Sequence, residues 1–267
     1  TWHGRKPFES FDSSLPRFMS EYGFQAFPEM KTIRMFAKEN DFELESPVMN
    51  AHQKATIGNA LIKQTMGLYY KVPARFEDLV YMGLVLQGHG MRHGMEAHRR
   101  NRPYCMGSLF WQLNDSWPVV SWSAIDYYGN WKALMYQSKR AFAPILINAI
   151  REDNDLCVYL ISDELHDRDD VSMTVELMDF DGKTHGRWTC NGRLTANFSL
   201  LFMKKPVGEW LGKQDAASSL LHLTLKAKNG TTLADNIYYF AYPKDQKLPE
   251  AHIETNLRRR GDSIEMT

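Results

Sequence analysis

Hydrophobic periodicity changes character near residue 145. Before that point, short apolar runs alternate with longer stretches of helical spacing. We expect strands that end at Trp2-His3 or span 17–20 and 105–113, and helices over 29–39, 46–70, 73–101 and 132–143. Ser46 is the expected N-cap of the second helix, with Pro47 in its first turn. This strand–helix order is typical of parallel strands with crossover helices, and two or three strands correspond to the last third of an eight-stranded barrel.

The second half of the chain has the pattern of an all-β domain. Its apolar runs are short, and many alternate with polar residues, as in 172–177 and 221–225. Turn signals such as Asp181-Gly182 and Asn229-Gly230 separate them. Five to seven strands over about 100 residues predict an immunoglobulin-like β-sandwich. We therefore expect domains at 1–144, 145–248 and 249–267, the last being a linker or the start of a further C-terminal domain.

Composition narrows the class of protein. Of 267 residues, 43% are hydrophobic and 24% charged, as in ordinary globular domains. Lys plus Arg equals Asp plus Glu, 32 each, so neither nucleic acid nor an anionic membrane is an expected partner. No apolar run approaches the roughly 20 residues of a membrane span. The three cysteines are widely spaced and indicate neither a disulfide framework nor a zinc site. The chain starts without Met, and we expect any targeting segment to belong to a longer protein.

Reactive side chains stand at three predicted strand ends. They are His3 beside Trp2, Glu21, and the segment from Trp111 to Asp115. In parallel α/β architectures the site lies at the carboxyl ends of the strands, so these side chains are expected to surround one cleft. A carboxylate that attacks the anomeric carbon, a second carboxyl that protonates the leaving oxygen and a ring that supports the sugar are the parts of a glycosidase.

Two long motifs carry a resemblance to a known family. Residues 16–33, PRFMSEYGFQAFPEMKTI, and 107–145, which begin GSLFWQLNDSWP, resemble the β-mannosidases of glycoside hydrolase family 2. The resemblance is strong over residues 1–150 and weaker over the β-rich part, which is similar to the immunoglobulin-like domain that follows the barrel in those enzymes. It implies α/β plus all-β architecture: the C-terminal part of a (β/α)8 TIM barrel followed by an immunoglobulin-like β-sandwich.

The resemblance also implies residue roles. Glu21 matches the nucleophile at the end of the seventh barrel strand, and Trp111 matches the indole beneath the sugar at the end of the eighth. Four further residues are expected to border or shape the same substrate-binding subsite: Trp2, His3, Asn114 and Asp115. The implied activity is that of a retaining exo-β-mannosidase that acts on β-mannoside oligosaccharides or glycoconjugates and needs no cofactor and no metal. The expected compartment is extracytoplasmic, such as a bacterial periplasm, with the lysosome as the alternative.

One part of the family pattern is missing. The general acid/base, a Glu after an Asn on the fourth strand, has no counterpart here, and neither have the early strands or the β domains before the barrel. We therefore expect a C-terminal fragment that is inactive without the remaining domains of the full-length enzyme. The carboxyl groups that might replace the acid are not predicted to lie opposite the nucleophile: Glu9, Asp12, Glu29 and Asp115.

Two alternatives remain open at this point. The first is a carbohydrate-binding or adhesive β-sandwich with an α/β scaffold, although five of the seven tryptophans precede residue 145. The second is a metal site in 87–98, QGHGMRHGMEAH, where His89 and His93 have helical ligand spacing. The segment lacks the HExxH order and carries three glycines, which weaken a helix. We favour an exposed helix face with Glu96 and Arg100 as an i,i+4 pair.

Overall fold

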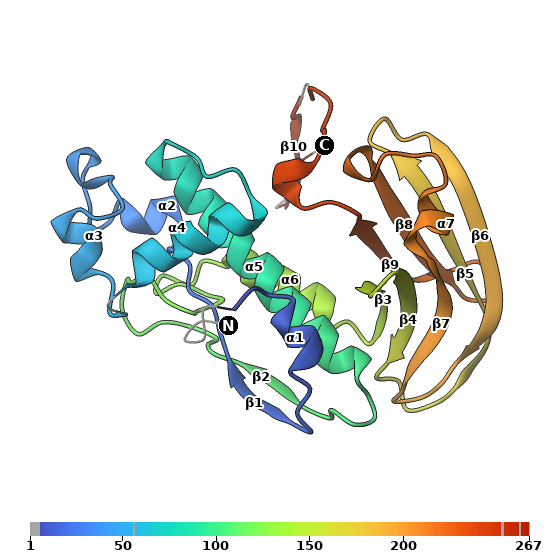
Figure 1. Cartoon of the computed structure of the whole chain (residues 1–267). Coiled ribbons are helices and arrows are strands. Elements are labelled where there is room, and N and C mark those ends of the chain that lie inside the picture. The colour runs from blue at the N-terminus through green and yellow to red at the C-terminus, as the bar shows by residue number, and fades with distance from the viewer. Residues whose placement is uncertain (1–5, 56, 252–253, 262, 267) are drawn as a thin grey trace.

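The computed structural model describes residues 6–55, 57–251, 254–261 and 263–266. The first half of the chain contains most of the helices, and the second half contains two packed sheets. Helix α5 belongs to the first half and lies where that half meets the sheets (Figure 1). The first half contains α1 (Ser10–Ser13), β1 (Met19–Tyr22), α2 (Met30–Ile33), η1 (Glu39–Asp41), α3 (Pro47–Ala51), α4 (Gly58–Tyr69), α5 (Phe76–Arg100), β2 (Ser108–Phe110) and α6 (Ala133–Ala141). Among the helices of the described residues, none has both the length and the apolar character needed to cross a membrane.

Strands β1 and β2 pair in parallel, as the alternation of strands and helices predicted. Met19 lies opposite Ser108 and Tyr22 opposite Phe110, with an irregular register between them. The predicted strand over 17–20 is two residues too early, so Glu21 lies within β1 rather than after it. The predicted strand over 105–113 is too long, because the backbone of Gln112 bonds to its own following loop: its N–H donates to Trp122 O over 3.1 Å.

The helix predictions were right in type and less accurate in extent. Ser46 caps α3, accepting a hydrogen bond from Met49 N over 3.2 Å. The single helix expected over 46–70 is wrong, because the chain leaves α3 to form a parallel bridge between Gln53 and Val120 before α4 begins. The helix expected over 29–39 is reduced to α2 followed by turns. Helices α5 and α6 lie within the predicted ranges.

Helix α5 is the centre of the first half, and its histidine-rich segment is buried rather than exposed. Gly90 and Gly94 lack a Cβ where the rings of Phe8 and Phe11 pack on the helix backbone. The expected ion pair is also wrong, since Glu96 bonds Arg92 at 2.7 Å. The glycines weaken an isolated helix, but here they let large rings approach its backbone closely.

The second half is the predicted sandwich of two antiparallel sheets, ordered β3-β4-β7 and β6-β5-β8-β9. Alternate residues of β8 are buried, as expected for strands with one face in a core. The elements are β3 (Ile145–Glu152), β4 (Asp155–Ser162), β5 (Arg168–Asp179), β6 (Thr184–Leu194), β7 (Ser199–Pro206), α7 (Val207–Leu211), η2 (Ala216–Ser218), β8 (Ser219–Lys226), β9 (Thr232–Tyr239) and η3 (Pro243–Asp245). A hairpin of β10 (Leu257–Arg260) and β11 (Ser263–Met266) follows where a linker was considered.

The two halves are joined by buried polar contacts along α5. Arg99 and Arg102 both contact the Asp163 carboxylate, at 2.9 and 2.7 Å. Asn148 on β3 donates to Glu96 on α5 over 2.8 Å. Helix α5 therefore contacts the two-stranded sheet on one side and the sandwich on the other. It fixes the position of β1 and β2 relative to the sandwich.

Candidate active site

Glu21 and Trp111 lie on one face of the β1–β2 pair, at the carboxyl ends of the strands. Trp111 N–H donates to Tyr22 O over 2.8 Å, so Trp111 continues β2 beside the last residue of β1. The Tyr22 side chain is buried against the helices. The register is irregular at this point, and the consecutive residues Ser20 and Glu21 are both exposed, so Glu21 is on the side away from that core. Trp111, the residue after the partner of Tyr22, is exposed as well. Glu21 is exposed and Trp111 is 50% exposed.

Gly23 allows the two strand ends to approach this closely. A Cβ at this position would lie 2.5 Å from Trp111 O and 2.8 Å from Cδ1 of Trp122. A side chain here would therefore separate the segment after Glu21 from the segment after β2. The glycine of the SEYG motif is thus explained by the backbone that it faces, and it links the two motifs that the sequence suggested were neighbours.

Three polar side chains, linked by hydrogen bonds, support the opposite face of the strands. Tyr22 Oη lies 2.8 Å from Ser108 Oγ, which lies 2.8 Å from His98 Nδ1 on α5. His98 Nε2 has no hydrogen-bond partner and lies among the rings of Phe11 and Tyr22, both perpendicular to the imidazole. Burial, with a smaller contribution from the Arg100 charge, lowers the pKa of His98 to about 4. The imidazole is therefore neutral near pH 7 and supports packing.

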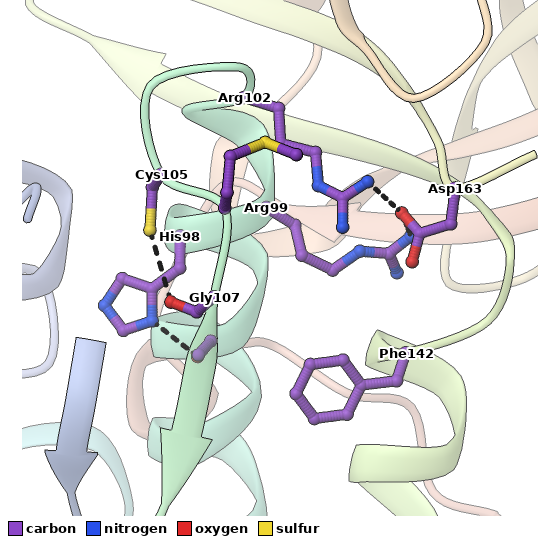
Figure 2. Close-up of a pocket in the computed structure, with 9 residues that line it drawn as sticks. His98, Arg99, Arg102, Cys105, Gly107, Phe142 and Asp163 are labelled. Carbon is purple, nitrogen blue, oxygen red and sulfur yellow. Dashed lines mark hydrogen bonds and ion pairs between the residues drawn. The ribbon is translucent and has the colours of Figure 1, made fainter. Parts of the chain in front are cut away.

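A small cavity of about 50 Å³ lies beside His98 and Ser108 (Figure 2). His98 and Cys105 lie on one side of it, and Phe142 and Asp163 on the other. Its two arginines both contact the Asp163 carboxylate, so each guanidinium already has a partner within the protein. The cavity is on the helix side of β2, away from the face that carries Glu21 and Trp111, and it is not part of the candidate active site.

The other predicted site residues have different surroundings. Asn114 is exposed and bridges to Ile125. Asp115 is buried, and its carboxylate accepts hydrogen bonds from Ser123 Oγ at 2.5 Å and Ser121 Oγ at 2.8 Å. Asp115 therefore shapes the loop after β2, and its carboxylate is occupied by protein donors rather than open to a sugar. Trp2 and His3 lie outside the described residues.

Two more of the carboxyl groups that might replace the missing acid, Glu9 and Asp12, are also bonded to other side chains. Glu9 accepts hydrogen bonds from the hydroxyls of Tyr69 and Tyr242, each at 2.8 Å. Asp12 contacts His93 at 2.9 Å and Arg100 at 2.6 Å. Both carboxylates are thus occupied by donors from the protein itself. Neither is therefore arranged as a proton donor to a leaving group.

Histidines of the 87–98 segment have local partners instead of a shared metal. His93 bonds Asp12, and His89 Nδ1 lies 3.2 Å from the Tyr70 hydroxyl. Among the residues that the structure describes, no three His, Cys, Asp or Glu side chains come together as metal ligands.

Two buried polar residues were not identified from the sequence. Gln87 on α5 and Lys132, immediately before α6, both donate to backbone carbonyls of the loops that follow β1 and β2. Their sequence signal is weak: each is a polar residue at a position that a helix pattern would place inside. Finding them required the tertiary structure.

Comparisons with known proteins agree with this geometry. Residues 154–245 match the family described as the Mannosidase Ig/CBM-like domain. The β-mannosidase of Bos taurus is 28% identical over 93% of this chain and 30% of its own length, and that of Capra hircus is 36% identical over 55% and 18%. The crystal structure of a β-D-mannosidase from Dictyoglomus thermophilum superposes with a TM-score of 0.86 at 30% identity, covering 96% of this chain and 32% of that one.

The chain thus spans 18 to 30% of the length of these curated relatives. An exo-chitosanase from Amycolatopsis orientalis shares the fold, with a TM-score of 0.72 at 19% identity. The architecture of the 267-residue chain itself is the C-terminal part of a (β/α)8 barrel followed by an immunoglobulin-like sandwich. Over nearly its whole length this chain is therefore similar to part of the β-mannosidases, and its sandwich matches the Mannosidase Ig/CBM-like domain.

Proposed function

We propose that this chain supplies the nucleophile side of a retaining exo-β-mannosidase active site. Glu21 bonds to C1 of a terminal β-mannoside as the bond from C1 to the leaving-group oxygen breaks and the acid/base carboxyl protonates that oxygen; water, deprotonated by the same carboxyl group, then hydrolyses the glycosyl-enzyme and releases mannose and the Glu21 carboxylate. The Trp111 ring lies beneath the sugar and excludes water from the developing positive charge. The observation that carries the proposal is that these two exposed side chains belong to the adjoining carboxyl ends of two parallel strands.

The acid/base carboxyl belongs, in this proposal, to a part of the enzyme outside these 267 residues. A retaining mechanism needs two carboxyl groups about 5–5.5 Å apart, and the nearby candidates Glu9, Asp12 and Asp115 are held by other partners. The chain alone is therefore expected to have no significant activity, since acid/base assistance contributes roughly 10² to 10⁴ in rate. The remaining domains of the full-length enzyme are its proposed partners, and Trp2 and His3 are proposed to border the sugar.

The rest of the proposal follows the family. The substrates are β-mannoside oligosaccharides or glycoconjugates, and the enzyme is extracytoplasmic or lysosomal. The domain limits remain 1–144, 145–248 and 249–267.

The alternative of a sugar-binding sandwich is less well supported by the positions of its tryptophans. Trp210 is 1% exposed and belongs to the core between the sheets. The ammonium of Lys205 lies 4.7 Å from the Trp188 ring centroid and covers that ring. Neither indole is an open platform of the kind on which a sugar stacks. Trp111, by contrast, is 50% exposed.

The test is covalent labelling in protein that carries the remaining domains. A 2-fluoro-mannosyl reagent should label the peptide that contains Glu21, and Glu21→Gln should fold normally but lose both label and turnover. Glu43→Gln, the same change at an exposed carboxylate of the same half of the chain, should retain both. A label on another acid, or normal turnover by Glu21→Gln, would overturn the assignment.

A further inference from the structure

We infer that Lys132 and Gln87 form a clamp that locks the loop after β1 to the loop after β2 and thereby positions Glu21 relative to Trp111. Both are positioning residues rather than catalytic ones, because they contact backbone and not substrate. The inference rests on the proposed function for its catalytic consequence, although the clamp itself is a property of the fold.

The point of attachment is a β-bridge between Ala26 and Ser121. Ala26 N–H donates to Ser121 O over 2.9 Å, and Ser121 N–H donates to Ala26 O over 3.1 Å. Ala26 lies five residues after Glu21 on the continuation of β1, and Ser121 lies in the loop that follows Trp111. This bridge is a direct backbone link between the two segments that carry the proposed site.

Lys132 adds a third and a fourth hydrogen bond to the same bridge. Its Nζ donates to Ala26 O over 3.2 Å and to Ser121 O over 3.3 Å, so both bridge carbonyls share one ammonium. The side chain is 1% exposed. A buried ammonium is costly unless its donors are satisfied, and here its acceptors are the two bridge carbonyls and Ser123 Oγ, the last at 3.5 Å.

Gln87 repeats this arrangement from a different helix. Its Nε2 donates to Phe24 O over 2.8 Å and to Ser123 O over 3.4 Å, again one carbonyl from each loop. Gln87 is fully buried in the middle of α5, and its Oε1 has no partner. The amide is therefore retained for its donors. Two side chains from two helices each join the same pair of loops, which makes a local clamp a better explanation than general core packing.

Three carboxylates around Lys132 oppose the loss of its proton. Asp115, Asp126 and Glu29 all face it and raise its pKa, whereas burial is the larger effect and lowers that pKa to about 7. Asp115 is connected to the ammonium through Ser123 Oγ, which donates to the carboxylate over 2.5 Å. The carboxylate that shapes the loop after β2 and the ammonium that fastens this loop are therefore parts of one buried network.

The loop is in turn bonded to the residues beside Trp111. Gln112 N–H donates to Trp122 O over 3.1 Å, and Ala124 N–H donates to Gln112 O over 3.0 Å. A loop released from the clamp therefore carries the Trp111 end of β2 with it. A displacement of about 1 Å between reacting groups can reduce a rate by about 10², so loss of the clamp should appear in the chemical step.

The experiment compares Lys132→Met with Lys139→Met in protein that carries the remaining domains. Methionine keeps the length of the stem and removes the donors, and Lys139 is an exposed lysine of α6. Hydrogen exchange should show at least a tenfold loss of protection in peptides that cover 23–27 and 119–125 of Lys132→Met, with β5 and β8 unchanged. The 2-fluoro-mannosyl label should still reach one per chain, at a rate lowered about ten- to hundredfold. Lys139→Met should match the parent in all of these measurements.

The outcomes separate the two proposals. Unchanged protection of both loops in a folded Lys132→Met would overturn the clamp, and so would an unchanged labelling rate. If Lys132→Met does not fold, Gln87→Met takes its place with the same expected pattern. If neither variant folds, both side chains are general core residues and the inference is wrong. If the parent itself has no turnover and no label, the proposed function fails, while hydrogen exchange still decides whether the clamp exists.

Discussion

Gly23→Ala is the change that most directly tests the contact between the two motif segments. The new Cβ would lie 2.5 Å from Trp111 O, whereas real Cβ atoms keep at least 3.0 Å, so the strand ends must separate by at least 0.5 Å. The obstacle is a backbone carbonyl, which cannot rotate away as the end of a side chain would. The 2.8 Å hydrogen bond from Trp111 N–H to Tyr22 O lies beside it and would be strained.

The free energy of unfolding should fall by about 2–4 kcal/mol. Overpacking contributes about 1–3 kcal/mol, and a weakened backbone hydrogen bond contributes about 1 kcal/mol. Urea unfolding followed by ellipticity at 222 nm measures this change, because the long helices lie in the same half of the chain as Gly23. In protein with the remaining domains, turnover of an aryl β-mannoside should fall more than the folded fraction does.

The matched control is Gly67→Ala. Gly67 lies in α4, and its new Cβ would meet the Val72 side chain at 3.7 Å, an ordinary contact. Alanine is about 1 kcal/mol more favourable than glycine in a helix, so this variant should be as stable as the parent or more so. If Gly23→Ala were within about 0.5 kcal/mol of the parent, the usual range of neutral surface changes, the close approach inferred at the strand ends would be wrong.

Three other changes test separate parts of the structure. Trp111→Ala should weaken both substrate binding and turnover in steady-state kinetics, and unchanged constants would assign the indole to packing alone. Because burial lowers the pKa of His98 to about 4, the unfolded chain binds a proton that the folded chain does not between about pH 6.5 and 4. As the pH falls through that window, the parent's free energy of unfolding should decrease by on the order of 3 kcal/mol. Urea midpoints should show this decrease in the parent and not in His98→Phe. Burial alone would raise the pKa of Asp12, but its bonds and charge interactions with His93 and Arg100 lower it below 3.8. The stability that they give is present above pH 3.8 and is lost as pH falls through the lowered pKa, so the deficit in the urea midpoint of Asp12→Asn relative to the parent should be largest near pH 6 and should shrink as the pH falls below 3.8.

The sequence predicted the neighbourhood of Glu21 and Trp111 because that information is local. Each lies at the end of a short apolar run, and parallel pairing brings such ends to one edge. The extents of the elements were harder to predict because tertiary contacts decide them. The helix expected through residue 52 stops there because His52 O accepts from Val120 N–H over 2.8 Å, a contact 68 residues away in the chain.

The glycine-rich part of α5 shows a different limit. Glycine and histidine count as polar in a pattern, so the segment 87–98 was interpreted as an exposed face. Yet Gly83, Gly90 and Gly94 recur at seven and four residues, which places them on one side of a helix, and each faces an aromatic ring of the core. The spacing was visible in the sequence, but the rings come from residues such as Phe8 and Phe27, and only the fold brings these to the helix.

The restraints on the proposed site all come from one side of the strands. The hydrogen-bonded chain from Tyr22 to His98 holds β1 and β2 to α5, and the clamp of Gln87 and Lys132 fastens the loops beyond them. These contacts lie within the described residues and need no other part of an enzyme. The opposite face, with Glu21 and Trp111, is open. Contacts on the helix side of the strands can therefore fix the proposed nucleophile, while the exposed side remains open to a sugar and to the second carboxyl group. A site whose groups are held in place before the substrate binds is preorganised, so the protein need not rearrange as charge develops in the transition state.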